Sequence, residues 1–403
     1  YATLVSSVLS ERLQAAEGQA APLRGSYKSA ASRTLLHVFP SFEIGGQQTR
    51  FATLARHFGS RYRHIVLSLS GRYEAESKLD AGVDYTRLPA IPAPKRFPLS
   101  LYQHRALLNR IKPDALVTYN WGSIEWVMAG RLTRVPQIHF EDGFGPEEAR
   151  RQIARRVWTR RLALRGKVQT IVPSKTLMGL ARDVWGLPDG GLHFVPNGID
   201  VERFAGGADA DYAARLHIPL DRPLIGTVTA LRREKNLDRL IDAFAAVRPL
   251  VPSVLVIVGD GPEKARLEAM VAARGLGEHV IFTGRLDRPE RLMGLFSLYA
   301  LSSDTEQMPL GVLEAMAAGV PVAATDVGDV AHMVCEDNRP FLASSGSGSG
   351  SGAGAGGSTL AEAMLGLLRE PGLARAIGLQ NQAKARARYT EDRMVDTIGR
   401  ILG

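Results

Sequence analysis

Short apolar segments alternate with helical segments along most of the chain, and this alternation limits the fold more than any other feature. Before residue 195 the apolar segments are Leu35–Phe39, Ile65–Ser70, Ala115–Asn120, Gln137–Gly143 and Thr170–Ser174; after it they are Leu224–Ala230, Val254–Asp260, Val280–Gly284, Leu298–Ser303 and Pro321–Thr325. The two segments Leu298–Ser303 and Pro321–Thr325 lack polar alternation, which is typical of parallel strands covered by helices on both faces. The sequence therefore predicts an α/β fold with doubly wound parallel sheets.

The length of 403 residues exceeds what one core usually supports, so we expect two domains. The alternation restarts near residue 195, which predicts similar domains at 33–194 and 195–403 with a cleft between them, a preferred place for small-molecule sites. The last helix is a candidate to pack back on the first domain. Residues 1–32 form a head segment without a clear strand pattern, and the Gly/Ser-rich residues 344–358 indicate a flexible or engineered loop.

Composition narrows the class of protein only slightly. No apolar run reaches the roughly 20 residues of a membrane span, and the head segment, which begins at Tyr1 and so indicates a truncated start, has no signal-peptide pattern. The single cysteine, Cys335, excludes an internal disulfide and fits a reducing compartment. The net charge of +9 is compatible with phosphate-bearing ligands or an anionic membrane. Nucleic acid is disfavoured, because aromatic residues are not interleaved with the basic ones.

The stretch from Leu298 to Gly328 holds the most informative pattern, in which a strand, a turn, a helix at about Pro309–Ala318 and a second strand follow one another. Glu306 lies in the turn and Glu314 lies eight residues later, inside the helix. The free amides at the helix start favour an anion. A phosphate at this mouth, a sugar near Glu306 and a ribose near Glu314 would use all three features. Taken alone, however, the two acids are better explained as solvated surface residues.

In the first half, residues at strand ends fall along one rim of the predicted sheet. They are Gly45, Gly46, Tyr119, Asn120, His139, Glu141, Asp142 and Ser174. The glycine pair before a helix can bring backbone amides near a phosphate, although a tight turn is the simpler explanation. His139 with Asp142 is the one cluster of this half that suits proton chemistry. A structural histidine remains the alternative.

Two further groups of basic residues need an interpretation. Residues 149–167 carry seven arginines and one lysine that fall all around a helix, which favours a solvated charged helix over a face toward an anionic acceptor or lipid headgroup. Arg232 and Lys235 follow a strand end, where two cations could neutralise a diphosphate. The turn Gly259–Pro262 and the pair Gly284-Arg285 end neighbouring strands of the same sheet.

Together these motifs resemble the large retaining glycosyltransferase family 4, which has the GT-B fold of two Rossmann-like domains facing a central cleft. The matching residues are Gly45-Gly46, Val172-Pro173-Ser174, Pro196 to Asp200, Lys235, Gly259 to Pro262, Gly284-Arg285, and Glu306 with Glu314 in EQMPLGVLEAMAAGVPVAAT. The resemblance covers roughly residues 34–400 and is strongest in the second half. One departure is that many members have a phosphate-binding arginine after a glycine where this chain reads Thr229-Ala230, so that Arg232 is the nearest candidate.

The resemblance implies transfer of a sugar from a UDP- or GDP-sugar to a carbohydrate, glycolipid or lipid-linked acceptor, with the anomeric configuration retained. It implies that Glu306 holds the donor sugar and Glu314 the ribose, and that Arg232, Lys235, Gly45 and Gly46 surround the diphosphate. Gly284, Arg285, Met308, Pro309 and Leu310 complete the implied donor site, and His139 or Asp142 would meet the sugar or the acceptor. No cofactor and no divalent metal are expected.

The sequence leaves two cellular locations and three alternative functions open. The resemblance fits a bacterial-type cytoplasm, with peripheral association at the inner membrane face as a further possibility. A sugar-nucleotide epimerase or a glycan phosphorylase on the same fold would carry other chemistry, although no lysine context suggests the pyridoxal phosphate that a phosphorylase needs. A scaffold that binds nucleotide or glycan without turnover is the non-enzyme alternative.

Overall fold

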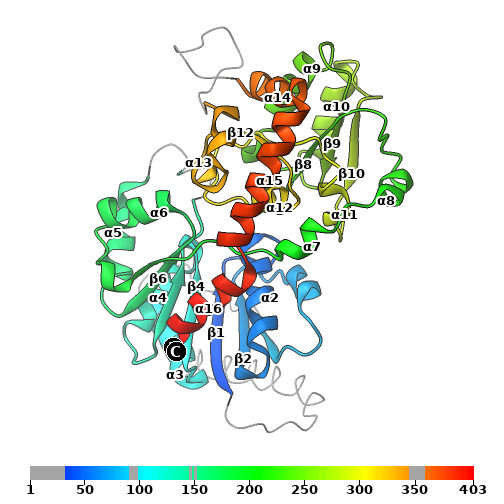
Figure 1. The fold of residues 1–403 in the computed structure, drawn as a ribbon. Coiled ribbons are helices and arrows are strands. Elements are labelled where there is room, and N and C mark those ends of the chain that lie inside the picture. Colours follow the sequence, from blue (N-terminus) through cyan, green and yellow to red (C-terminus); the bar gives the residue numbers. More distant parts are fainter. Residues whose placement is uncertain (1–31, 90–98, 145–147, 149–151, 345–358) are drawn as a thin grey trace.

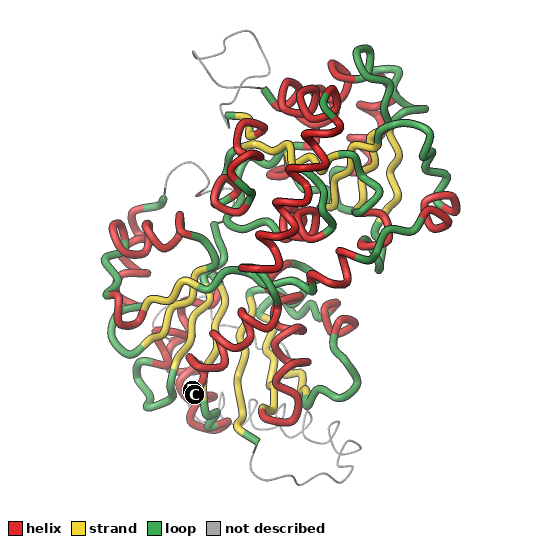
Figure 2. Tube along the Cα trace, viewed as in Figure 1, coloured by secondary structure: helices red, strands yellow, loops and turns green. Residues whose placement is uncertain are grey.

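The computed structural model describes residues 32–89, 99–144, 148, 152–344 and 359–403. It contains two parallel sheets, each flanked by helices and stacked one above the other along the molecule (Figures 1 and 2). This arrangement confirms the predicted fold class. The structure of the head segment up to residue 31, and of residues 345–358 in the Gly/Ser run, lies outside the described residues.

The first sheet has seven strands in the order β3-β2-β1-β4-β5-β6-β7, all paired in parallel. The strands are β1 (Arg33–Phe39), β2 (Tyr62–Ser68), β3 (Tyr85–Leu88), β4 (Ala115–Tyr119), β5 (Gln137–Phe140), β6 (Val168–Val172) and β7 (Leu192–Phe194). The flanking helices are α2 (Gly46–Phe58), α3 (Leu99–Ile111), α4 (Ile124–Gly130), α5 (Ala154–Ala163) and α6 (Lys175–Gly179). The sequence pattern did not indicate β3, a short edge strand with one buried residue among its four.

The second sheet has six strands in the order β10-β9-β8-β11-β12-β13, again all parallel. Its strands are β8 (Leu224–Val228), β9 (Val254–Val258), β10 (Val280–Gly284), β11 (Leu298–Leu301), β12 (Val322–Thr325) and β13 (Leu342–Ala343). Its helices are α7 (Val201–Ala205), α8 (Ala210–Arg215), α9 (Leu237–Val247), α10 (Lys264–Ala273), α11 (Glu290–Met293), α12 (Leu310–Ala317), α13 (Val330–Met333), α14 (Leu360–Arg369) and α15 (Pro371–Arg388).

The last helix, α16 (Glu391–Leu402), returns to the first domain, where Figure 1 shows it in red beside β1 and α2. Its apolar face, including Met394 and Ile398, is buried in the same core as Leu35 and Phe51. The chain thus crosses between the domains twice, and the crossings are joined: Ile199 N–H donates to Tyr389 O at 2.9 Å and Glu391 N–H to Ile199 O at 3.0 Å. We call these two joined segments, residues 194–199 and 389–393, the hinge between the domains.

Local sequence explains how α12 comes to lie close to the sheet. Its residues Val312, Leu313, Ala315 and Met316 are buried. Gly311 lets the helix start approach β11, because a Cβ at this position would lie only 2.2 Å from the Tyr299 hydroxyl oxygen. The small residue therefore fixes where the amides at the start of α12 point, which matters for the site below.

No helix in the described parts of the chain combines the length and the apolar character needed to cross a membrane.

Candidate functional site

The turn before α12 is where the second domain meets the first. A Cβ added at Gly46 would lie 3.6 Å from Leu310 Cδ1, and one added at Gly143 would lie 3.1 Å from Gln307 Cγ. The Ser174 hydroxyl donates to Gln307 Oε1 at 2.9 Å. The glycine loop before α2 and the start of α12 therefore lie next to each other, at contact distance, where the two domains meet.

Lys235 and Glu306 form an ion pair within the second domain. Lys235 Nζ lies 2.6 Å from Glu306 Oε1, and the same oxygen accepts a hydrogen bond from Ser303 Oγ at 2.8 Å. The two side chains are 23% and 11% exposed, so a ligand in the cleft can reach both. The pair places a cation and a carboxylate side by side at the mouth of α12.

Arg232 and the Gly284-Arg285 pair complete this edge of the second sheet. Arg232 is exposed and acts across the cleft: the pKa of Glu43 lies below its ordinary value, mainly through hydrogen bonds from Ser41 and Arg72 and with a smaller contribution from Arg232. Gly284 ends β10 with a φ of 71° and accepts a hydrogen bond from Gly259 N–H at 2.9 Å. Arg285 is exposed beyond it.

Glu314 lies half-buried on α12, and among the described residues no side chain or backbone group donates a hydrogen bond to its carboxylate. Burial raises its pKa to about 7, the positive charge of Arg203 opposes the shift, and Glu290 adds to it. Arg203 itself pairs with Glu290 at 2.8 Å. A carboxyl with a pKa raised by burial and no donor among the described residues is a candidate for a functional site.

The structure does not bring His139 into the cleft. Its side chain is fully buried, with Nδ1 2.9 Å from Thr118 Oγ1 and Nε2 3.6 Å from Glu141 Oε2. The assignment of His139 to the sugar or acceptor is therefore corrected, because no ligand in the cleft can touch it in this arrangement. Tyr119 and Glu141, placed on the same rim by sequence, are also buried.

Asp142 does lie at the rim, but it is not free for proton chemistry in this arrangement. Its carboxylate forms a two-pronged ion pair with Arg50 of α2, with Nη2 to Oδ2 at 2.6 Å. Arg50 also donates to Asn197 Oδ1 at 3.2 Å and lies over the Phe140 ring. Asp142 therefore joins β5, α2 and the hinge, and its place beside the cleft is set by Arg50.

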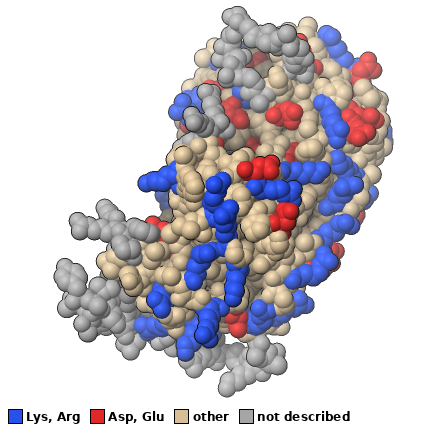
Figure 3. Space-filling view, turned by 90° about the vertical axis from the view of Figure 1, so that its left-hand side faces the viewer, with Lys and Arg blue, Asp and Glu red and all other residues tan. Residues whose placement is uncertain are grey.

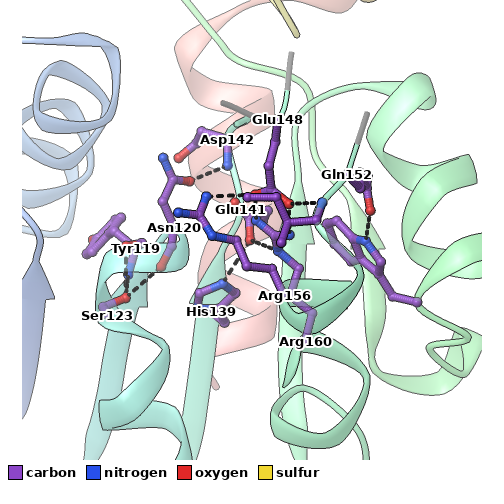
Figure 4. A network of polar contacts seen from close by, with 12 residues as sticks. Tyr119, Asn120, Ser123, His139, Glu141, Asp142, Glu148, Gln152, Arg156 and Arg160 are labelled. Carbon is purple, nitrogen blue, oxygen red and sulfur yellow. Dashed lines mark hydrogen bonds and ion pairs between the residues drawn. The ribbon is translucent and has the colours of Figure 1, made fainter. Parts of the chain in front are cut away.

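A buried ionic network lies behind Asp142, and Figure 4 shows it at the end of β5. The guanidinium group of Arg160 on α5 donates to Glu141 at 3.3 Å and to both carboxylate oxygens of Glu148 at 3.2 and 3.0 Å, and all three side chains are at most 1% exposed. This corrects the interpretation of residues 149–167 as a merely solvated helix, since Arg160 faces the core. Residues 149–151 of that segment lie outside the described part.

Two family models match the chain, one in each domain. Residues 44–203 match the family model described as Glycosyltransferase Family 4, and residues 209–349 match the one described as Glycosyl transferases group 1. The chain belongs to the group 1, or family 4, glycosyltransferases. Residues 306 to 314 lie within the second matched region, and Gly45, Gly46 and Asp142 lie within the first.

Relatives of this family 4 chain include a GDP-mannose-dependent alpha-mannosyltransferase of Mycobacterium tuberculosis, which is 31% identical over 62% of this chain and 66% of its own length. The putative glycosyltransferase EpsF of Bacillus subtilis is 34% identical over 34% of this chain. The chain spans only 36% of the length of EpsF. The solved structure of Anabaena Alr3699/HepE in complex with UDP has the same fold, with a TM-score of 0.75 at 18% identity over 92% of this chain and 99% of that one.

Sequence reasoning missed several residues that position the site of this glycosyltransferase family member. Arg50 precedes the apolar residues Phe51 and Leu54 on the buried face of α2, and its spacing of four from Leu54 was the available signal. Asp329, from the second domain, accepts hydrogen bonds from the backbone N–H of Thr176 at 2.9 Å and its hydroxyl at 2.8 Å, at the start of α6. That contact joins distant segments and leaves no pattern in the sequence.

Proposed function

We propose that the protein transfers a sugar from a nucleotide diphosphate sugar to a carbohydrate, glycolipid or lipid-linked acceptor, with retention of the anomeric configuration and without a divalent metal. The observation that carries the proposal is the Lys235–Glu306 pair at the mouth of α12, opposite Gly46 of the first domain. In this proposal the donor would lie between the two domains, where this pair would offer it a cation and a carboxylate side by side.

Cleavage of the bond between the sugar and the diphosphate leaves negative charge on the leaving oxygen. Lys235, Arg232 and the free amides at the start of α12 offer positive charge there, and such preorganised electrostatic stabilisation is a large part of catalysis. Glu306, held by Ser303 and Lys235, would accept hydrogen bonds from the sugar hydroxyls. Retention requires the acceptor oxygen to join the face of the sugar from which the diphosphate leaves.

The charges of this chain support the expectation that no divalent metal is needed. The cations at the mouth of α12 would take over the neutralising role, as they do by charge-assisted contact in other phosphate sites. We also propose that the protein acts in the cytoplasm, where sugar nucleotides would be available as substrates.

Peripheral membrane association is proposed from the outer face of α5. Trp158 and Leu162 lie one helical turn apart and are 66% and 65% exposed, with Arg155 and Arg161 nearby on the same helix. Exposed aromatic and aliphatic groups beside arginines suit a bilayer interface. We expect the protein to co-sediment with vesicles containing phosphatidylglycerol and the variant W158A/L162A to bind them several-fold less. Equal sedimentation of both proteins would remove the membrane from the proposal.

Calorimetric titration with UDP, GDP and ADP, in buffer with EDTA, tests the donor site. Relatives and neighbours with GDP-mannose or UDP in their names make both UDP and GDP worth testing. We expect one nucleotide to bind selectively. Glu314→Ala and Glu314→Gln should weaken it about tenfold or more at pH 8, since a hydrogen bond from a hydroxyl to a charged acceptor contributes about 1.5 kcal/mol or more.

The raised pKa of Glu314 gives this titration a pH dependence of known sign. Between pH 6 and pH 8 the carboxyl loses its proton and becomes the better acceptor for ribose hydroxyls, so affinity should rise with pH. The phosphates of the nucleotide titrate in the same range, and Glu314→Gln retains only their share of the rise. An identical pH profile for wild type and Glu314→Gln would contradict the ribose assignment.

The same titration and a donor assay separate the alternatives. Conversion of the sugar nucleotide without any acceptor would indicate an epimerase, and bound pyridoxal phosphate would indicate a phosphorylase. Tight nucleotide binding without product from any donor would indicate a binding scaffold. Absence of binding by all three nucleotides would count against the proposed donor site itself.

A further inference from the structure

A cavity of about 650 Å³ lies beside the hinge and has no part in the proposed chemistry. Its walls come from both domains: Lys175 of α6 and Val195-Pro196 of the first crossing on one side, and α13 on the other. The ends of α15 and α16 close it at the second crossing. Of the residues assigned to the donor site, only Met308 also lines this cavity. This cavity therefore contacts both domains and is lined almost entirely by residues outside the proposed donor site.

The charge of this cavity is strongly positive. Five cationic side chains line it, which are Lys175, Arg339, Lys384, Arg388 and Arg393, against two carboxylates, Asp329 and Glu336. Arg339 lies 3.8 Å from Glu336, and the Asp329 carboxylate is occupied by the start of α6. Figure 3, which views the molecule from the side of α6 and α13, shows Lys and Arg gathered over the middle of this face. The cavity thus carries a net excess of cations.

Three of the cations have no acceptor of their own. Within the described residues, the side chains of Lys175, Arg388 and Arg393 form no hydrogen bond and no ion pair. Lys384 donates to the backbone oxygens of His332 and Val334 at 2.7 and 2.6 Å. Its pKa is lowered by burial and by the charges of Arg339 and Arg388, as expected where cations converge without a counter-ion.

The other groups that face the cavity do not supply the missing negative charge. His332 is on α13, Cys335 is a buried thiol and Thr390 and Thr397 are neutral. Guanidinium groups prefer planar or tetrahedral oxyanions that accept several hydrogen bonds at once. The volume exceeds that of a single phosphate and falls in the range of small-molecule sites. A phosphate-bearing solute or headgroup meets both the charge and the size.

We infer that this hinge cavity binds an anion carrying one or more phosphate groups, held by Arg388 and Arg393 on one domain crossing and by Lys175 of the first domain, and that the bound anion stabilises the domain arrangement described here. The Asp329 contact with the start of α6 already joins the domains beside it. An anion between Lys175 and Arg388 adds a second link across the same hinge, and a ligand that prefers one arrangement shifts the population toward it.

Calorimetric titration with inorganic diphosphate tests the site. The donor site would also bind diphosphate, so the measurement is made in a Lys235→Ala background. There, R388A/R393A should weaken the binding about tenfold or more, because two charge-assisted contacts are lost. The matched control is R386A/R400A, which removes two arginines from the same helices: Arg386 pairs with Glu202 and Arg400 bonds within its own helix, and neither lines the cavity. It should bind diphosphate within about twofold of its parent.

Two further measurements complete the test. Diphosphate should slow hydrogen exchange at 194–199 and 389–393 in the control and not in R388A/R393A. Vesicles with phosphatidic acid, compared with phosphatidylcholine alone, distinguish a lipid headgroup from a free solute: sedimentation that depends on Arg388 and Arg393 identifies the headgroup. Equal diphosphate affinity and equal vesicle binding in the two double variants would overturn the site. Binding without slower hinge exchange would overturn the link to domain arrangement. Failure of nucleotides to bind would touch the proposed function alone.

Discussion

Glu306→Ala is expected to lower kcat about 10²- to 10³-fold while nucleotide affinity stays within a few-fold of wild type. The carboxylate lies at the mouth of α12, where it would hold the hydroxyl groups of the donor sugar while the bond to the diphosphate breaks. A free nucleotide has no donor sugar, so its affinity should not depend on this contact. Loss of one preorganised group of this kind typically costs that factor in turnover. The measurement is release of UDP or GDP from the sugar nucleotide whose base binds in the titration above.

A matched pair of variants gives this result its meaning. Glu268→Ala removes an exposed carboxylate from α10 and should leave turnover unchanged. Within the described part of the chain, its one ion pair is a 3.9 Å contact with Lys264. Lys235→Ala removes the partner of Glu306 and should weaken both nucleotide binding and turnover, because the ammonium would contact the diphosphate in the ground state and in the transition state. Turnover by Glu306→Ala near the wild-type rate would remove Glu306 from the site.

The periodic patterns of strands and helices in the sequence predicted most of the fold. The predicted strand Val280–Gly284 matches the structure at both ends, and the other predicted apolar segments form strands of the two sheets. These patterns work because buried parallel strands and amphipathic helices leave direct periodic signals. The turn before α12 was informative for a related reason: its proline and its acids have local roles that a sequence shows.

The first-domain site was harder to predict, because the end of a strand fixes only where a residue lies along the sheet. Successive side chains point to opposite faces, so His139 and Glu141 point together into the interior while Asp142 reaches the rim. Because both faces of this sheet are buried, the hydrophobic residues of a strand do not show toward which face a polar residue at its end points. The Arg50–Asp142 pair depends on contacts between residues 92 positions apart, which no local pattern contains.

Arg160 shows the same limit and leads to the prediction with the largest effect on stability. Val157 and Arg160 on α5 and Leu164 directly after it follow a helical spacing of three and four, so the arginine occupies a position in an apolar stripe. Arginines on the other faces of the helix hid that stripe from the sequence pattern. The ring centroids of Trp121 and Trp185 each lie 5.1 Å from the guanidinium carbon of Arg160. Removing Arg160 leaves the buried carboxylates of Glu141 and Glu148 without the hydrogen bonds and the positive charge that it supplies.

Arg160→Met is expected to destabilise the first domain by about 3–5 kcal/mol at pH 7, the typical cost of breaking a buried ion pair from one side. Arg155→Met, an exposed arginine on the same helix, should change stability by no more than about 0.5 kcal/mol. Urea unfolding followed by tryptophan fluorescence suits this comparison, because all four tryptophans lie before residue 195 and report on the first domain.

The pH dependence of that destabilisation separates lost charge from lost packing. Burial raises the pKa of Glu148, but hydrogen bonds from Arg160, from Ile153 N–H and from Arg156 more than offset it, so the pKa lies below the ordinary value. The stability that Glu148 contributes is therefore present above the ordinary carboxyl pKa and is lost as pH falls through the folded value. Without Arg160 its carboxyl is protonated more readily, and the difference between Arg160→Met and wild type should narrow as pH is lowered from 7 toward 4.5. A constant difference would mean that Arg160 stabilises the domain through packing against the tryptophans rather than through its charge.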